Sequence, residues 1–198
     1  GLNAGKLYFK GINVDTQSAH VTTTSTQNDG APKIVTATRT KGATANNYIF
    51  VNGTQAGTNT SDDNSLTDPI YLGIGRNPTE TTSQFVGYIS EAIGKDYLSS
   101  TTERDITETY LAVKYGVTLA HDYKRAHATD SVIYAISGYG YDVAGLGRMN
   151  TFSLHQKVSS SVNVASGSSR IVMATSNNFM LPYQDASRTV LTDEQYLV

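Results

Sequence analysis

The chain has 198 residues, a formal net charge of −2 and no cysteine. The absence of cysteine excludes disulfide bonds, thiolate zinc sites and a thiol nucleophile. The 15 basic residues form no cluster of the kind that nucleic-acid binding requires, and no apolar run approaches the roughly 20 residues of a membrane helix. We therefore expect neither a nucleic-acid partner nor membrane insertion.

The composition favours a mainly β fold. Only 16% of the residues are charged, whereas Thr, Ser, Asn and Gly are abundant and there are 13 tyrosines. Thr and Tyr suit pleated strands, and Gly, Asn and Ser suit the turns between them. A polar, Thr-rich chain without cysteine fits an exported bacterial protein better than a small eukaryotic secreted domain. Because the chain opens directly in strand-like sequence, we interpret it as part of a longer polypeptide.

Alternating apolar residues predict three short strands near residues 7–12, 20–24 and 34–38. The next strand, 48–51, is followed by Asn52-Gly53, a strong hairpin signal because both residues tolerate a positive φ.

The following segment has a less uniform pattern. Residues 56–68 show no periodic apolar face and are predicted to form an exposed loop, whereas 69–74 and 85–96 are predicted to contain strands. The expected core residues are Ile49, Val51, Leu72, Ile74, Phe85, Ile89, Ala92, Ile106, Tyr110 and Leu111.

One segment is predicted to be helical, at about residues 101–115. Ser100 and Glu103 have the spacing of a capping box, in which each side chain bonds the other residue's backbone N–H. Apolar residues then recur at helical spacing, and Gly116 provides a left-handed stop.

Strand patterns return after the helix, and residues 120–198 are predicted to form a second, smaller β unit or an extension of the first. The expected strands are 132–136, 142–146, 158–164, 170–174 and 196–198.

Five segments carry a resemblance to a known family. Residues 48–53, 71–75 and 85–91, in that order, resemble the C-terminal half of a laminin-G/concanavalin-A-like jelly roll, and 98–119 resembles the closing helix of bacterial versions. Residues 137–157 resemble an uncharacterised β segment that follows this helix in such proteins.

The resemblance implies a concanavalin-A-like jelly-roll sandwich, with the C-terminal part of the sandwich and its closing helix in residues 1–119 and a β extension in 120–198. It also implies a bacterial secreted or cell-surface location, in adhesin-type proteins with neighbouring domains or subunits. The N-terminal strands of a full sandwich are not found in this sequence. Either a separate piece or a neighbouring subunit supplies them by strand addition, or the chain is simply truncated.

The first functional hypothesis is a non-catalytic module that binds a glycan or another extracellular polymer. Tyr139 and Tyr141 on a Gly-rich tip, with Asp142 and Arg148 nearby, are the candidate ligand-binding residues, because tyrosine combines an apolar ring with a free hydroxyl. The alternative is that these tyrosines cover a sheet edge. The second hypothesis is a structural, self-assembling subunit of a surface fibre in which neighbouring chains supply strands.

Calcium is the metal that the sequence favours. Asp62, Asp63, Asn64 and Asp68 offer several oxygen ligands within one predicted loop. The spacing matches no complete loop motif, so a solvated polar turn is the competing interpretation.

Catalysis is the least favoured hypothesis. Glycosidases of this fold need two carboxylates on one strand face, and no predicted strand contains an acidic-x-acidic pair. Glu103 and Asp105 alternate at the start of the helix, where they favour its positive end. His121 and His127 lie six residues apart and are interpreted as surface histidines. We expect a protein that is not an enzyme.

Overall fold

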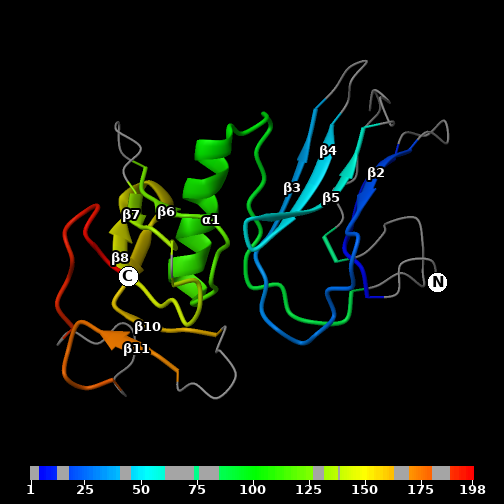
Figure 1. The fold of residues 1–198 in the computed structure, drawn as a ribbon. Coiled ribbons are helices and arrows are strands. Elements are labelled where there is room, and N and C mark those ends of the chain that lie inside the picture. The colour runs from blue at the N-terminus through cyan, green and yellow to red at the C-terminus, as the bar shows by residue number, and fades with distance from the viewer. Residues whose placement is uncertain are drawn as a thin grey trace.

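The computed structural model describes residues 5–12, 18–40, 46–60, 74–75, 85–126, 132–137, 139–162, 170–179 and 188–198. Two groups of small antiparallel sheets lie side by side, one built from the first 60 residues and the other from residues after 120 (Figure 1). The helix α1 (Thr101–Tyr115) stands between them (Figure 1).

Among the described residues of the N-terminal half, five strands form two sheets. The bounds are β1 Tyr8–Ile12, β2 Ser18–Thr22, β3 Val35–Arg39, β4 Asn47–Val51 and β5 Thr54–Asn59. Strands β1 and β2 pair with each other, and the second sheet has the order β3-β4-β5.

The predicted hairpin at Asn52-Gly53 is confirmed. These two residues join β4 to β5 with φ angles of 49° and 85°, so the turn needs residues that tolerate a left-handed backbone. Strand β2 packs against β4 and β5, and Val21 and Ile49 are each only 1% exposed. A Cβ at Gly57 would overlap the carbonyl oxygen of Thr22, so the glycine allows the two sheets to approach closely.

The helix has the predicted bounds, and both predicted end signals are confirmed. Ser100 and Glu103 form the reciprocal capping box, and Gly116 ends the helix with φ 68°. A Cβ at Gly116 would also overlap the carbonyl oxygen of Ser160, so this position needs glycine for two separate reasons.

In the described part of the C-terminal half there are seven short strands in three sheets. The bounds are β6 Tyr123–Lys124, β7 Val132–Tyr134, β8 Leu146–Met149, β9 Leu154–Gln156, β10 Val158–Ser160, β11 Val172–Ala174 and β12 Tyr196–Leu197, with the 3-10 turn η1 at Asn150–Phe152. The sheets are β6-β7, β10-β11 and β12-β8-β9. The helix packs against β6, β8, β9 and β10.

The main core lies between the helix and this C-terminal half. Its buried members are Ile34, Tyr110, Ala112, Val113, Val117, Leu119, Tyr123, Val143, Met149 and Leu154. Of the predicted core residues, Tyr110 belongs to this cluster, and Ile106 and Leu111 pack against it. Ile49 is buried in the N-terminal half, and Val51 is half-buried. Leu72 lies outside the described residues.

The prediction of a strand in residues 85–96 is wrong. Residues 85–100 form no strand. Phe85 and Ile89 are each about half exposed, and Ala92 is exposed as well. Ile74, another expected core residue, is 54% exposed. An alternating pattern makes a segment competent to pair, but a strand forms only where a partner is present.

Two other boundaries differ from the prediction. Residues 56–59 belong to β5 rather than to a loop, because the hairpin pairs this polar segment with β4. The expected strand at 142–146 begins only at Leu146, and β6 and β9 were not predicted. The other four C-terminal strands overlap their predicted ranges.

The described residues thus form a mainly β fold with one α-helix and several small antiparallel sheets. Within them, no helix has the length and apolar character required to cross a membrane. The helix packs against strands from residues after 120, and the predicted boundary between 119 and 120 stays a prediction.

Candidate functional site

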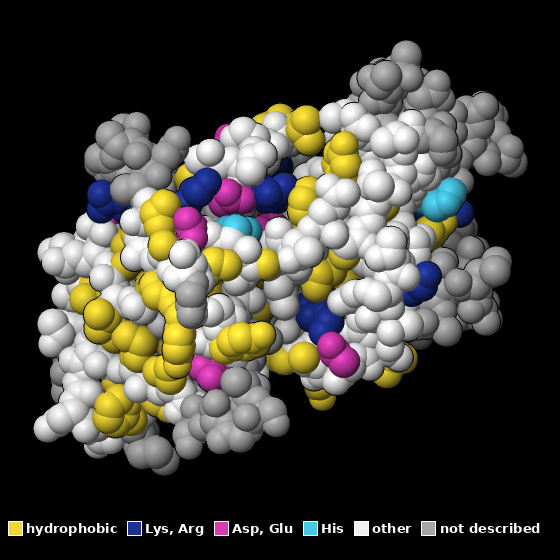
Figure 2. All heavy atoms as spheres, in the orientation of Figure 1, with side chains coloured by type: hydrophobic (Ala, Val, Ile, Leu, Met, Phe, Trp, Pro, Cys, Tyr) yellow, Lys and Arg dark blue, Asp and Glu magenta, His cyan; other side chains and the backbone are white. Residues whose placement is uncertain are grey.

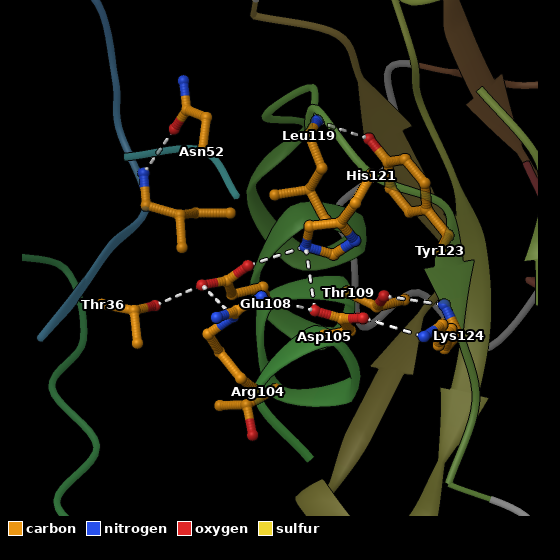
Figure 3. Close-up of polar contacts among 12 residues, drawn as sticks. Thr36, Asn52, Arg104, Asp105, Glu108, Thr109, Leu119, His121, Tyr123 and Lys124 are labelled. Atoms are coloured by element: carbon orange, nitrogen blue, oxygen red, sulfur yellow. Dashed lines mark hydrogen bonds and ion pairs between the residues drawn. The ribbon is translucent and has the colours of Figure 1, made fainter. Parts of the chain in front are cut away.

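Three ionisable side chains converge where the two halves meet. Asp105 and Glu108 lie one turn apart on α1, and His121 follows the helix in the segment that leads to β6 (Figure 3). Asp105 is 4% exposed and Glu108 is 1% exposed. We call these three residues the polar centre. In a space-filling view, acidic and basic side chains gather over α1 between the halves (Figure 2).

His121 makes a polar contact through each ring nitrogen. Nε2 lies 2.7 Å from Oε2 of Glu108, and Nδ1 lies 2.8 Å from the backbone oxygen of Asp122. A backbone oxygen and a carboxylate both accept hydrogen bonds, so this geometry favours a ring that donates through both nitrogens. Burial alone would lower the pKa of His121, but the bonds to Glu108 and Asp122 and the charge of Asp105 outweigh it and raise the pKa above its usual value.

Each carboxylate is also held from its outer side. The hydroxyl of Thr36, on β3, donates to Oε1 of Glu108 over 2.6 Å, and Nζ of Lys124, on β6, donates to Oδ2 of Asp105 over 2.8 Å. The remaining oxygens, Oε2 and Oδ1, face Nε2 of His121 at 2.7 and 3.8 Å. The outer partners therefore turn one oxygen of each carboxylate inwards.

Arg104 completes the charge balance. Its NH2 lies 3.3 Å from Oδ1 of Asp105, and its Nε lies 3.8 Å from Oε1 of Glu108. The guanidinium also stacks 4.0 Å from the ring centroid of Phe50, on β4. With His121 protonated, three cations surround two buried carboxylates, so each carboxylate is compensated and the polar centre carries one excess positive charge.

Backbone contacts bring the β4–β5 hairpin to this place. The backbone N–H of Ala120 donates to the carbonyl of Asn52 over 2.8 Å, and the Asn52 side chain accepts from the N–H of Ile34. A Cβ at Gly53 would overlap the ring of His121. The turn between β4 and β5 therefore lies in direct contact with the ring of His121.

The segment that carries His121 is fixed to the helix on its other side. The Tyr123 hydroxyl accepts from the N–H of Leu119 over 3.1 Å, and Thr109 accepts from the N–H of Lys124 over 2.9 Å (Figure 3). These contacts set the position of His121 independently of its own bonds.

A second carboxylate contact lies elsewhere along α1. Glu91, in the irregular segment before the helix, accepts from the hydroxyls of Tyr110 and Tyr115 at 2.6 and 2.9 Å and from Nζ of Lys114 at 2.9 Å. Burial opposes the charge on Glu91, but the three donors outweigh it and lower its pKa. We call this contact the Glu91 anchor.

The predicted ligand-binding residues do not form one surface. Tyr139 and Tyr141 are 64% and 68% exposed, whereas Asp142 is 5% exposed. The guanidinium of Arg148 donates to the Asn150 side chain and to the Leu191 carbonyl. The two tyrosines are exposed, whereas Arg148 is half-buried and Asp142 is buried.

The proposed calcium ligands, Asp62, Asp63, Asn64 and Asp68, lie outside the described residues. Among the residues that the structure does describe, the polar centre is the one group of His, Asp and Glu side chains able to hold a metal ion, with one ligand atom from each residue and all of these atoms within 4.8 Å of one another.

Sequence reasoning missed the polar centre. His121 was interpreted as a surface histidine, but its side chain is only 18% exposed. A signal was present in the helix: Asp105, Glu108, Thr109 and Ala112 follow the i, i+3, i+4, i+7 spacing of a buried face. A polar stripe at core spacing indicates partners elsewhere in the fold.

Comparisons with known proteins cover the second half of the chain. Residues 103–198 match the model of a family described as a domain of unknown function (DUF8202). No curated protein and no solved structure gave a match. The matched range contains Asp105, Glu108, His121 and Lys124, and it leaves out the N-terminal sheets. The chain is therefore similar to this family from the first turn of α1 to Val198, over the segment that carries the polar centre.

Proposed function

We propose that the chain is a non-catalytic module of a bacterial extracellular or cell-surface protein and that it binds a glycan or another extracellular polymer. The observation that carries the proposal is the pair of exposed tyrosine rings at Tyr139 and Tyr141. The finer fold assignment, a concanavalin-A-like jelly roll with a C-terminal β extension, belongs to the same proposal. Its support is the resemblance in residues 48–119 together with the small antiparallel sheets.

The backbone beside the first tyrosine is held in place. The N–H of Tyr139 donates to the carbonyl of Ile136, and the carbonyl of Tyr139 accepts from the hydroxyl of Tyr134, each over 3.0 Å. Asp142, next to Tyr141, is buried. Rings presented on a fixed backbone lose little conformational freedom on binding. A sugar offers an apolar ring face and hydroxyl groups, which match the ring and hydroxyl of tyrosine.

A panel of immobilised glycans tests the proposal. We expect saturable binding that falls about tenfold, or about 1.4 kcal/mol, when both Tyr139 and Tyr141 are changed to alanine. Tyr88→Ala is the matched control, because Tyr88 is 99% exposed on another segment. Equal losses in the control and the double variant, or no binding to any glycan by the folded protein, would contradict the proposal.

A specific observation favours a second candidate, a self-assembling subunit to which neighbouring chains add strands. Residues 85–98 form no strand, and Val86 and Tyr88 are 95% and 99% exposed. A segment outside any strand that exposes apolar side chains suits pairing with a strand of a neighbouring copy.

Light scattering after size exclusion distinguishes the two candidates. The assembly candidate predicts a discrete oligomer or polymer that Val86→Lys with Tyr88→Lys disperses, whereas Val190→Lys, at another exposed position, does not. A strictly monomeric native protein would eliminate this candidate and leave the polymer-binding module.

A further inference from the structure

We propose that the polar centre is a binding site for one divalent transition-metal ion, with Oδ1 of Asp105, Oε2 of Glu108 and Nε2 of His121 as its ligands. The polar centre shares no residue with the exposed tyrosine pair, so this inference does not depend on the proposed polymer binding. It rests on the geometry of the three ligand atoms, their outer partners, and the charge balance around them.

The ligand atoms already lie near the separations that an ion requires. One ligand atom from each of the three residues lies within 4.8 Å of the other two, and Nε2 of His121 lies 2.7 Å from Oε2 of Glu108 and 3.8 Å from Oδ1 of Asp105. Ligands about 2.0–2.2 Å from a tetrahedral zinc ion are roughly 3.3–3.6 Å apart. The pair at 2.7 Å must therefore open by less than about one ångström, a movement within reach of small side-chain rotations.

Each ligand residue has an outer partner that directs the correct atom inwards. The carbonyl of Asp122 holds the proton on Nδ1 of His121, which points Nε2 at the carboxylates. Thr36 occupies the outer oxygen of Glu108, and Lys124 occupies that of Asp105. Metal sites in proteins are commonly built this way, with the second atom of each ligand hydrogen-bonded and its orientation thereby fixed.

The charge balance permits the exchange. An ion would replace the proton that Nε2 now shares with Glu108, and this proton would leave to solvent. The local charge would then rise by only one, since a divalent cation takes the place of one H⁺. Lys124 and Arg104 remain 23% and 16% exposed, so solvent screens their charges. The one contact that must yield is the 3.3 Å approach of Arg104 to Oδ1 of Asp105.

The ligand types select the class of ion. Calcium takes six to eight oxygen ligands, whereas one imidazole nitrogen with two carboxylate oxygens suits zinc and neighbouring transition metals. Three protein ligands leave at least one coordination position for water. The 18% exposure of the His121 side chain gives a route to it.

The test uses the whole chain after treatment with a chelator. Zn²⁺ is titrated calorimetrically, and Co²⁺ is followed by its visible absorption. We expect one ion per chain, with binding lost in His121→Ala and Glu108→Gln. His155→Ala, a change to a histidine on β9, should bind as the native chain does. Thr36→Val keeps every ligand and charge and removes only an outer partner, so it should weaken binding about 10–100-fold.

Two results would overturn the proposal. Unchanged affinity in His121→Ala would place any bound ion elsewhere. Failure of the folded native chain to bind Zn²⁺ or Co²⁺ would mean that the polar centre is only an ion-pair junction. Circular dichroism checks the fold of every variant, and if Glu108→Gln does not fold, the comparison of Thr36→Val with His155→Ala decides the outcome.

Discussion

Two irregular segments flank α1, and each is tied to the helix through carboxylate contacts. Residues 117–122 follow the helix and carry His121 into the polar centre, where both carboxylates are less than 5% exposed. Residues 85–100 precede it and are held by the Glu91 anchor, where the side chains of Glu91 and Lys114 are 22% and 37% exposed. Similar chemistry therefore operates in two different environments.

The difference shows what burial does to an ion pair. In water, a broken pair is replaced by solvation, and its loss costs little. In the interior, the partner left behind is a charge without solvent, and its cost is large. We therefore expect the polar centre to set the relative positions of the two halves, and the Glu91 anchor only to position one segment.

The largest expected effect comes from removing a carboxylate at each place. Glu108→Ala should lower the free energy of unfolding by about 3–5 kcal/mol, because it removes a fully buried carboxylate together with its bonds to Thr36 and His121 and leaves Asp105 as the one acidic partner of Arg104 and His121. Glu91→Ala should cost about 1 kcal/mol or less. Urea denaturation of both variants measures the difference. Equal losses of unfolding free energy would mean that the difference in solvent exposure does not change how much each contact contributes to stability.

A second test disturbs the contact between the β4–β5 hairpin and the ring of His121. Gly53 has φ 85°, and an added Cβ would overlap the histidine ring. Gly53→Ala should cost about 1–3 kcal/mol. Gly30→Ala is the matched control, because Gly30 has φ 79° and nothing within 4 Å of its added Cβ. The additional loss of unfolding free energy at Gly53, compared with Gly30, measures the steric clash with His121. Equal losses in the two variants would show that His121 can move away from the added Cβ at little cost.

Local signals account for what the sequence predicted well. The capping box, the helical spacing and Gly116 all lie within about four turns of one another, and the helix bounds follow from them alone. The Asn52-Gly53 hairpin is local in the same sense. These elements need no information from distant residues.

The polar centre and residues 85–100 depend on distant partners. Thr36 and Glu108 are 72 residues apart in sequence, so no spacing rule joins them. In residues 85–100, the alternating pattern predicted a strand and buried apolar residues, but a strand also requires a paired neighbour. The spacing of apolar residues in a sequence indicates which side chains share a face. Whether another part of the protein packs against that face depends on the fold.

A smaller effect is expected where residues 85–100 meet the helix. Ser100→Ala removes half of the capping box, including the bond from the Glu103 N–H to the serine hydroxyl. We expect a loss of about 1 kcal/mol in urea denaturation. Ser100→Asp keeps a hydrogen-bond acceptor at this position and should therefore retain most of the stability that Ser100→Ala loses. Equal losses in both variants would show that the capping hydroxyl contributes nothing specific.

The smallest expected effect is the response of the Glu91 anchor to acid. The pKa of Glu91 is lowered in the folded chain, against its burial, by the donors Tyr110, Lys114 and Tyr115. A lowered pKa stabilises the contact above the usual glutamate value of 4.5, and this stabilisation is lost as the pH falls through the folded value. Amide NMR shifts of residues 85–100 should therefore move on acidification below pH 4.5.

Glu91→Gln is the control for this titration, because it cannot ionise and leaves Lys114 and both tyrosines in place. We expect its amide shifts in residues 85–100 to be nearly constant over the same pH range. If the variant titrates as the native chain does, another carboxylate controls the segment. If neither titrates, the three donors at Glu91 do not determine how residues 85–100 lie on the helix, and the contrast between an exposed and a buried carboxylate would then rest on the polar centre alone.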